Sequence, residues 1–342
     1  MISCPPVETK VKTAIVALVL GLLAVLLPGQ AVAEPSPLLR QHGHLVVLGT
    51  SGLRWQDVDF SDPASRPFAK FAEEGVVANL VTRSTAAVSC PADGWLSLGA
   101  GQRATISRRS GKCAFPQVRD QQVQGWKQLT ADVIPAGQVG LGYLQAALAQ
   151  DRKSAVAVGP GAALALADKD GKLARPVLRN TGNLADTVST AARENHVTVV
   201  DTGAVDPANP PQVTGQLNPT PQGGYPQLDQ KASDRVQVRA KVRQLSQIVK
   251  ALPEGTQVII ASLAEGNQVP HLQLLAMQAD AFAPGLAKSG SLRRDGLVQT
   301  ADLTQTILQS IGAPPAENSP GATVWTAGRS GKIDFPDRIA SL

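Results

Sequence analysis

Histidine and cysteine, the side chains that most often bind transition metals, are scarce in this sequence. The 342 residues include four histidines and three cysteines. A two-zinc site needs about six to eight ligands from histidine and carboxylate side chains. His42 and His44 precede one predicted strand and His196 precedes another, whereas ligands in α/β sheets bind at the carboxyl ends of strands. We therefore expect no complete two-metal centre.

Aromatic residues and dense basic runs are also few. Aromatics make up 4% of the chain, and its formal charge of +5 comes from 32 Lys and Arg set against 27 Asp and Glu. Nucleic-acid-binding domains cluster their basic residues on one face or along one helix. The basic residues here are scattered, so the sequence gives no support for nucleic-acid binding. Glycine and proline are frequent (31 and 25 residues), which is typical of a loop-rich globular protein.

The one long apolar run lies near the amino terminus, from Ala14 to Leu27. Two lysines precede it, and Ala31-Val32-Ala33 follows it. This order of positive, apolar and small residues is typical of a secretory signal peptide. The run has about 14 residues, fewer than the about 20 that a membrane-spanning helix needs. We predict a signal peptide over residues 1–33, and a mature protein that is secreted or held on the extracytoplasmic face of the cell membrane. The alternative is an uncleaved segment that contacts the membrane.

Removal of that segment also removes Cys4 and leaves Cys90 and Cys113. An even pair of cysteines in an exported chain predicts a disulfide. The bridge would close a loop of about 24 residues and stabilise the protein by about 3 kcal/mol. Two free thiols or a metal-binding pair are the alternatives, although the spacing matches no zinc pattern.

Short apolar runs alternate with amphipathic helical patterns along the rest of the chain. We expect strands at 44–48, 76–81, 154–158, 197–200, 257–261 and 272–277. We expect helices at 67–74, 142–150, 184–194, 233–252 and 303–311, and another that begins near 95. The alternation predicts an α/β fold with a mostly parallel central sheet flanked by helices. Residues 34–342 then form a single domain, with a Pro/Gly-rich loop at 203–228 and an irregular tail from 315.

The first candidate binding segment is the loop that follows the first strand, Gly49-Thr50-Ser51-Gly52-Leu53-Arg54-Trp55. Ligands bind at strand carboxyl ends in open α/β sheets, and glycines allow a backbone to approach a bound group. We predict that Thr50, Ser51 and Arg54 bind an anionic ligand. A plain strand-to-loop turn is the alternative.

The second candidate segment reads Ser89-Cys90-Pro91-Ala92-Asp93-Gly94-Trp95-Leu96-Ser97-Leu98-Gly99-Ala100-Gly101. A helix that begins here would point its backbone N–H groups at an anion. Ser89 is the candidate nucleophile if a metal or base lowers its pKa, and Asp93 is a candidate binding residue. The alternative is that Ser89 caps the helix. We expect the two segments to face each other across one crevice.

These motifs resemble those of the alkaline-phosphatase/sulfatase superfamily. More closely, the chain is similar to the extracytoplasmic domain of a group of uncharacterised actinobacterial secreted or membrane proteins, which carry G-T-G-G-L-R-W and T-C-P-x-D-G-W-L-x-L-x-A-G. Residues 296–308, GLVQTADLTQTIL, also resemble the superfamily's late G-x-V-x-x-x-D-L-x-x-T-[IL]-L. The resemblance covers about residues 44–315 and implies an alkaline-phosphatase-like fold.

The resemblance also implies a site. The superfamily's nucleophile stands two places before a proline, which here is Ser89 before Pro91, and two zinc ions or one calcium ion activate it. Its ligands are Asp and His residues at strand ends. Here Thr50 or Ser51 occupies the place of the first Asp, and the stretch after residue 261 has neither Asp nor His at the matching place. Asp201 alone stands where a metal ligand is expected.

Two main interpretations follow. The first is an exported cell-envelope protein with a degenerate, metal-free alkaline-phosphatase-like domain, acting in binding or assembly with an envelope protein or anionic ligand. The second is an enzyme, a metal-dependent hydrolase or transferase of phosphate or sulfate esters, with Ser89 as nucleophile and Zn, Mg, Mn or Ca as the divalent metal. A third is an envelope protein that shares the fold alone, because fold does not determine function.

Overall fold

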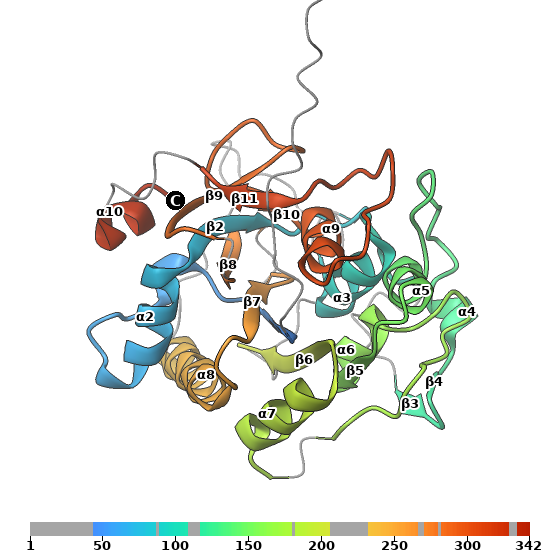
Figure 1. Ribbon diagram of the computed structural model, residues 1–342, viewed down its shortest axis with the longest axis horizontal. Helices are drawn as coiled ribbons and strands as arrows, with labels where there is room; N and C mark the ends of the chain where they lie inside the picture. The colour runs from blue at the N-terminus through green and yellow to red at the C-terminus, as the bar shows by residue number, and fades with distance from the viewer. Residues whose placement is uncertain are drawn as a thin grey trace, which may run out of the picture. The chain divides into compact units, whose positions relative to one another are not determined.

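A computed structural model describes residues 44–86, 89–108, 117–179, 182–205, 232–265, 270–279, 282–327 and 334–342. Within these residues the chain forms a nine-stranded sheet with the order β11-β9-β2-β8-β7-β1-β6-β5, and β10 pairs with β2 beside this path. Figure 1 shows helices on both sides of the sheet. The predicted signal peptide, residues 1–33, lies outside the described residues. No helix among the described residues is long and apolar enough to cross a membrane.

The parallel half of the sheet is centred on β1 (Leu45–Ser51). It lies between β6 (Val197–Ala204) and β7 (Gln257–Ser262), and is parallel to both. β5 (Ala155–Val158) continues the parallel pairing beyond β6. All seven residues of β1 are buried, because a central parallel strand is covered on both faces.

The other half mixes the two directions. β8 (Gln273–Gln278) is antiparallel to both of its neighbours, β7 and β2 (Val76–Val81). β9 (Gly285–Ser289) and β10 (Leu297–Gln299) are parallel to β2, and β11 (Val324–Thr326) is antiparallel to β9. The sheet is therefore mostly parallel, as the sequence predicts.

Helices cover each face because alternate residues of a strand point to opposite sides. Val47 belongs to one core, with α3 (Pro91–Ala100), α5 (Tyr143–Gln150), α6 (Pro160–Ala165) and α9 (Thr300–Ser310). Val46 belongs to the other, with α2 (Arg66–Glu74), α7 (Leu184–Glu194), α8 (Ala232–Ala251) and the short α10 (Phe335–Ala340). The result is a three-layer α/β/α arrangement (Figure 1).

Close packing around Trp95 joins α3 to the sheet. A Cβ added at Gly49 would lie 2.2 Å from the Trp95 ring, and one added at Gly161 would also lie 2.2 Å from it. A Cβ at Gly94 would lie 2.1 Å from the carbonyl oxygen of Leu263. The indole therefore fits only because β1 and α6 each present a glycine to it, and α3 approaches the end of β7 only because residue 94 is a glycine.

Three predictions about secondary structure need correction. The helix near residue 95 begins at Pro91, since Pro91 occupies its first turn and Asp93 caps it. Residues 159–161, for which we predict no helix, lead into α6, with Pro160 in the first turn. The tail after 315 is not wholly irregular, because it contains β11 and α10. Most of the predicted loop at 203–228 lies outside the described residues, and β6 extends into its first two positions.

Gly94→Ala should destabilise the protein by about 1–3 kcal/mol, the usual loss for overpacking. The added methyl group would collide with backbone atoms of Leu263, although alanine is the better helix former by about 1 kcal/mol. Urea denaturation measures the change. The control is Thr190→Ala on the exposed face of α7, where stability should stay within about 0.5 kcal/mol. Equal behaviour of the two variants would contradict the packing described here.

Candidate functional site

The two candidate segments meet at the stretch that continues β7, residues 263–265. The amide of Leu263 donates to the carbonyl oxygen of Thr50 (2.8 Å), and the amide of Gly52 donates to that of Ala264 (2.8 Å). On the opposite side Ser89 contacts Glu265. The structure thus brings both segments to the carboxyl edge of the sheet, with residues 263–265 between them.

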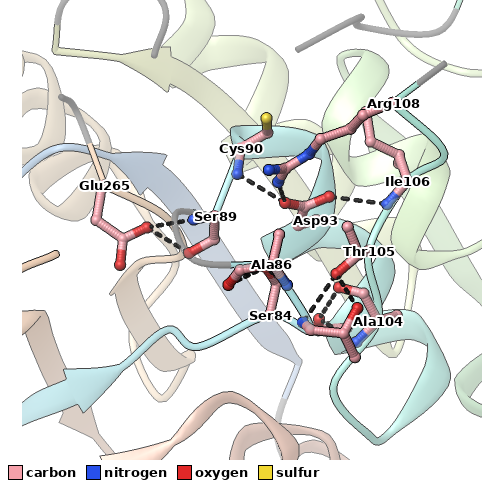
Figure 2. A network of polar contacts seen from close by, with 12 residues as sticks. Ser84, Ala86, Ser89, Cys90, Asp93, Ala104, Thr105, Ile106, Arg108 and Glu265 are labelled. Carbon is pink, nitrogen blue, oxygen red and sulfur yellow. Dashed lines mark hydrogen bonds and ion pairs between the residues drawn. The ribbon is translucent and has the colours of Figure 1, made fainter. Parts of the chain in front are cut away.

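Ser89 is buried, and both its hydroxyl group and its backbone amide form hydrogen bonds. Its hydroxyl donates to the carbonyl oxygen of Thr82 (2.6 Å) and also contacts Glu265 Oε2. Its amide donates to the same carboxyl oxygen (3.0 Å), while the Thr82 hydroxyl donates to Glu265 Oε1 (3.0 Å). Figure 2 shows the two contacts from Ser89 to Glu265. Only 2% of Ser89 is exposed.

Glu265 lies in an environment that disfavours its charged form. It is 4% exposed. Burial raises the pKa of its carboxyl, and the hydrogen bonds from Ser89 and Thr82 act in the opposite, weaker sense. A buried carboxyl without a cation against it is more stable when protonated. From the sequence, Glu265 enters only as an alternative to Asp201 for binding one hard cation in an active hydrolase, on the signal of a single carboxylate just beyond the end of a buried strand, and Thr82 is not assigned to the site.

Asp93 belongs to a separate buried network at the start of α3 (Figure 2). Its carboxylate accepts hydrogen bonds from the amides of Cys90 (2.7 Å) and Ile106 (2.8 Å), and it pairs with the Arg108 guanidinium. Burial raises the pKa of Asp93, while Arg108 acts to lower it. This fully buried residue anchors residues 106–108 to the helix, and its predicted ligand-binding role stays a prediction.

The N-cap position of α3 is occupied by Cys90 and not by Ser89. The Asp93 side chain, in the first turn of the helix, caps this end by accepting a hydrogen bond from the backbone amide of Cys90. The alternative in which Ser89 caps the helix is therefore wrong. Cys90 is fully buried. Cys113 lies outside the described residues, so the disulfide stays a prediction.

The candidates of the first segment also make contacts within the fold. The Thr50 hydroxyl donates to the carbonyl oxygen of Gly203 (2.7 Å), and both Thr50 and Ser51 are buried. Arg54 binds the Asp57 carboxylate through Nε (2.8 Å) and a terminal nitrogen (2.6 Å). These contacts hold the loop that follows β1 in place. The predicted role of Thr50, Ser51 and Arg54 in anion binding has no direct support from them.

Asp201, the weak metal candidate, lies within β6. One of its carboxylate oxygens accepts from the amide of Gly161 (2.8 Å) and the other from the amide of Gly203 (2.9 Å). Burial raises its pKa, and nearby Lys241 contributes a smaller lowering. Among the described residues, no three His, Cys, Asp or Glu side chains gather as metal ligands would. The described strand ends therefore do not fit the two-zinc or calcium centre that the resemblance implies.

Comparison with known proteins gives similarity at the level of fold. No family model matches the sequence, and no curated protein matches it. The chain is similar to a protein of the alkaline phosphatase superfamily from Vibrio parahaemolyticus, with a TM-score of 0.48, 12% identity, and coverage of 83% of this chain and 70% of that one. It is also similar to murine ectonucleotide pyrophosphatase/phosphodiesterase 5, with a TM-score of 0.46, 9% identity, and coverage of 80% of this chain and 96% of that one. For a 2-O GAG sulfatase the TM-score is 0.41 and the identity 13%, with coverage of 82% of this chain and 73% of that one.

Asp93→Ala should destabilise the protein by about 3–5 kcal/mol, because it leaves the buried Arg108 charge without its carboxylate. Urea denaturation monitored by circular dichroism measures this loss. Asp170→Ala is the control, since it removes an ion pair in which both side chains are exposed. We expect the control to unfold at nearly the wild-type urea concentration. If both variants behave alike, Asp93 is not the anchor of residues 106–108.

Proposed function

We propose that this chain is an exported cell-envelope protein whose alkaline-phosphatase-like domain acts in binding or assembly rather than in ester hydrolysis. The observation that carries the proposal is the state of the Ser89 hydroxyl, which is 2% exposed and hydrogen-bonded to Thr82 and Glu265. A serine nucleophile needs a group that removes its proton and an approach for the substrate. Ser89 instead joins three segments of the fold.

The other candidate groups support the same proposal. Thr50, Asp93 and Asp201 each satisfy backbone or ion-pair partners within the chain. A carboxylate whose oxygens already accept backbone N–H groups is poorly placed to bind a metal ion. These candidate residues therefore stabilise the fold. We expect a partner to bind elsewhere, on the protein surface. The formal charge is +5 for the whole chain and +4 once residues 1–33, with two Lys and one Glu, are removed. This positive charge favours an anionic ligand or an acidic surface of an envelope protein.

One observation favours the second function, hydrolysis or transfer of phosphate or sulfate esters. Glu265 Oε2 contacts the Ser89 hydroxyl. If Glu265 were ionised it would accept the Ser89 proton as Oγ attacks the phosphorus or sulfur atom and the ester's alcohol leaves. A divalent ion of the kind that the resemblance implies would lower the Ser89 pKa. The burial of both residues opposes this function.

Metal analysis and an ester assay separate the two functions. For the purified mature protein we expect less than stoichiometric Zn, Mn, Mg and Ca by mass spectrometry. We also expect no turnover of p-nitrophenyl phosphate or p-nitrophenyl sulfate above the buffer rate with each ion added. Ser89→Ala should leave this background unchanged while it destabilises the fold by about 1–3 kcal/mol, because the partners of the hydroxyl, the Thr82 carbonyl and the Glu265 carboxyl, remain buried.

Stoichiometric metal together with turnover that disappears in Ser89→Ala would overturn the proposal and establish an ester hydrolase. Ser97→Ala is the matched control, because Ser97 is a buried serine of α3 whose hydroxyl bonds to the backbone of Ala104. It should lose comparable stability. A hydrolase would keep its activity in this variant.

Export and the disulfide are tested by the intact mass of the protein collected from outside the cytoplasm. We expect a chain that begins at Glu34 and weighs two hydrogen atoms less than its reduced form. Thiol alkylation should label Cys90 and Cys113 only after reduction, and a digest without reduction should yield one peptide pair that links them. A full-length chain would show that the amino-terminal segment is retained. Labelling of Cys90 without reduction would exclude the disulfide.

A further inference from the structure

The hydroxyl of Ser89 faces two oxygen atoms but has a single proton. The carbonyl oxygen of Thr82 lies 2.6 Å from Ser89 Oγ, and Glu265 Oε2 is also in hydrogen-bond contact with it. A carbonyl oxygen accepts only, and so does an ionised carboxylate. One of the two contacts therefore lacks a proton if Glu265 is charged. Both are satisfied if Glu265 carries the proton and donates it to Ser89 Oγ.

The remaining contacts of Glu265 agree with this arrangement. Oε1 accepts from the Thr82 hydroxyl (3.0 Å) and Oε2 accepts from the Ser89 amide (3.0 Å). Both bonds are compatible with a neutral carboxyl group, which keeps acceptor capacity on its oxygens. The carboxyl is 4% exposed, and burial raises its pKa.

We propose that Glu265 is protonated in the folded protein and forms a proton-dependent latch, in which Glu265 donates to Ser89 Oγ and Ser89 donates to the Thr82 carbonyl. The latch joins Thr82, which follows β2, and Ser89, seven residues later, to Glu265 on the continuation of β7, which is 176 positions from Ser89. Loss of the proton places two acceptors against one hydroxyl, so these three residues separate more easily as pH rises. The latch goes beyond the proposed function and does not rest on it.

The ionisable groups on the elements that pack around the latch are otherwise engaged. On the β2 side, Arg83 follows Thr82 and is exposed. On α3, Asp93 is paired with Arg108. After β1, Arg54 is bound to Asp57. The polar side chains at the end of β1 itself are uncharged hydroxyls. The pKa of Glu265 is therefore set by burial, which raises it, and by hydrogen bonds from Ser89, from the backbone amide of Glu265 itself and from Thr82, which lower it.

The sign of the pH dependence follows from the proton count. A carboxyl whose pKa is raised on folding binds more protons in the folded chain than in the unfolded one. Its stabilising contribution is complete below the carboxyl pKa in the unfolded chain, about 4.3. The contribution is lost as pH rises through the pKa in the folded chain. In that window the unfolding constant should rise by up to tenfold per pH unit for the one proton released.

The test compares the pH dependence of unfolding in the wild type and in Glu265→Gln. The glutamine amide can donate to Ser89 Oγ at every pH but cannot also accept from the Ser89 backbone amide, as Glu265 Oε2 does. This variant should therefore lose stability by an amount that does not change with pH, and it should lack the tenfold-per-unit component above about pH 4.3. Glu254→Gln, at an exposed glutamate, is the control and should follow the wild type. Equal pH slopes in the wild type and in Glu265→Gln would overturn the latch.

A second measurement on the wild type alone covers the case in which Glu265→Gln does not fold. Carbon NMR of protein labelled at its glutamate carboxyls follows each titration directly. The chain has eight glutamates before any cleavage, and we expect one resonance with a clearly raised midpoint. Midpoints all at or below about 4.3 would overturn the latch. Neither result depends on the metal and turnover assays, so the latch and the proposed function fail separately.

Discussion

The packing of Trp95 against two glycines is the constraint on which the rest of this edge of the fold depends. Its indole occupies the space that a side chain would take at Gly49 in β1 and at Gly161 in α6. This contact fixes α3 against the sheet, and the absence of a side chain at Gly94 lets the helix approach Leu263. The start of α3 is therefore held beside the continuation of β7, which is the geometry that places Ser89 next to Glu265.

Hydroxyl groups at the strand ends complete this edge by bonding to the backbone of neighbouring strands. The Thr202 hydroxyl donates to the carbonyl oxygen of Gly49 (2.9 Å), and that of Thr50 donates to Gly203 (2.7 Å). Ser262 accepts from the amide of Leu53 (3.0 Å) and donates to the side chain of Gln273 (2.7 Å). Hydroxyl side chains at the carboxyl ends of β1, β6 and β7 thus close the sheet with neutral hydrogen bonds.

Sequence reasoning was accurate where burial imposes a period. The apolar runs at 76–81 and 197–200 predict β2 and the first half of β6, and the spacing along 233–252 predicts α8. It missed α6, because Gly159-Pro160-Gly161 is typical of a turn and also of a helix start with proline in its first turn. It also missed β9, whose residues Gly285–Ser289 form no continuous apolar run.

The site was harder to predict because its contacts join residues far apart in sequence. Asp93 looked available for binding in the motif, but its partner Arg108 stands 15 residues later and approaches it only after the chain turns back. Ser89 is separated from Glu265 by 176 positions. No local spacing encodes either pair.

The two buried carboxyls at the start of α3 show why position alone does not assign a role. Both Asp93 and Glu265 lose solvent on folding, and burial raises the pKa of each. Asp93 has a guanidinium and two backbone amides against it, so its charge has partners that replace water. Glu265 has the hydroxyls of Ser89 and Thr82 and two backbone amides, that of Ser89 and its own, against its carboxyl, which suit a neutral acid. A neutral Glu265 cannot take a proton from Ser89. The contact between Ser89 and Glu265 resembles that of a nucleophile and its base. With a neutral Glu265 it is a structural hydrogen bond.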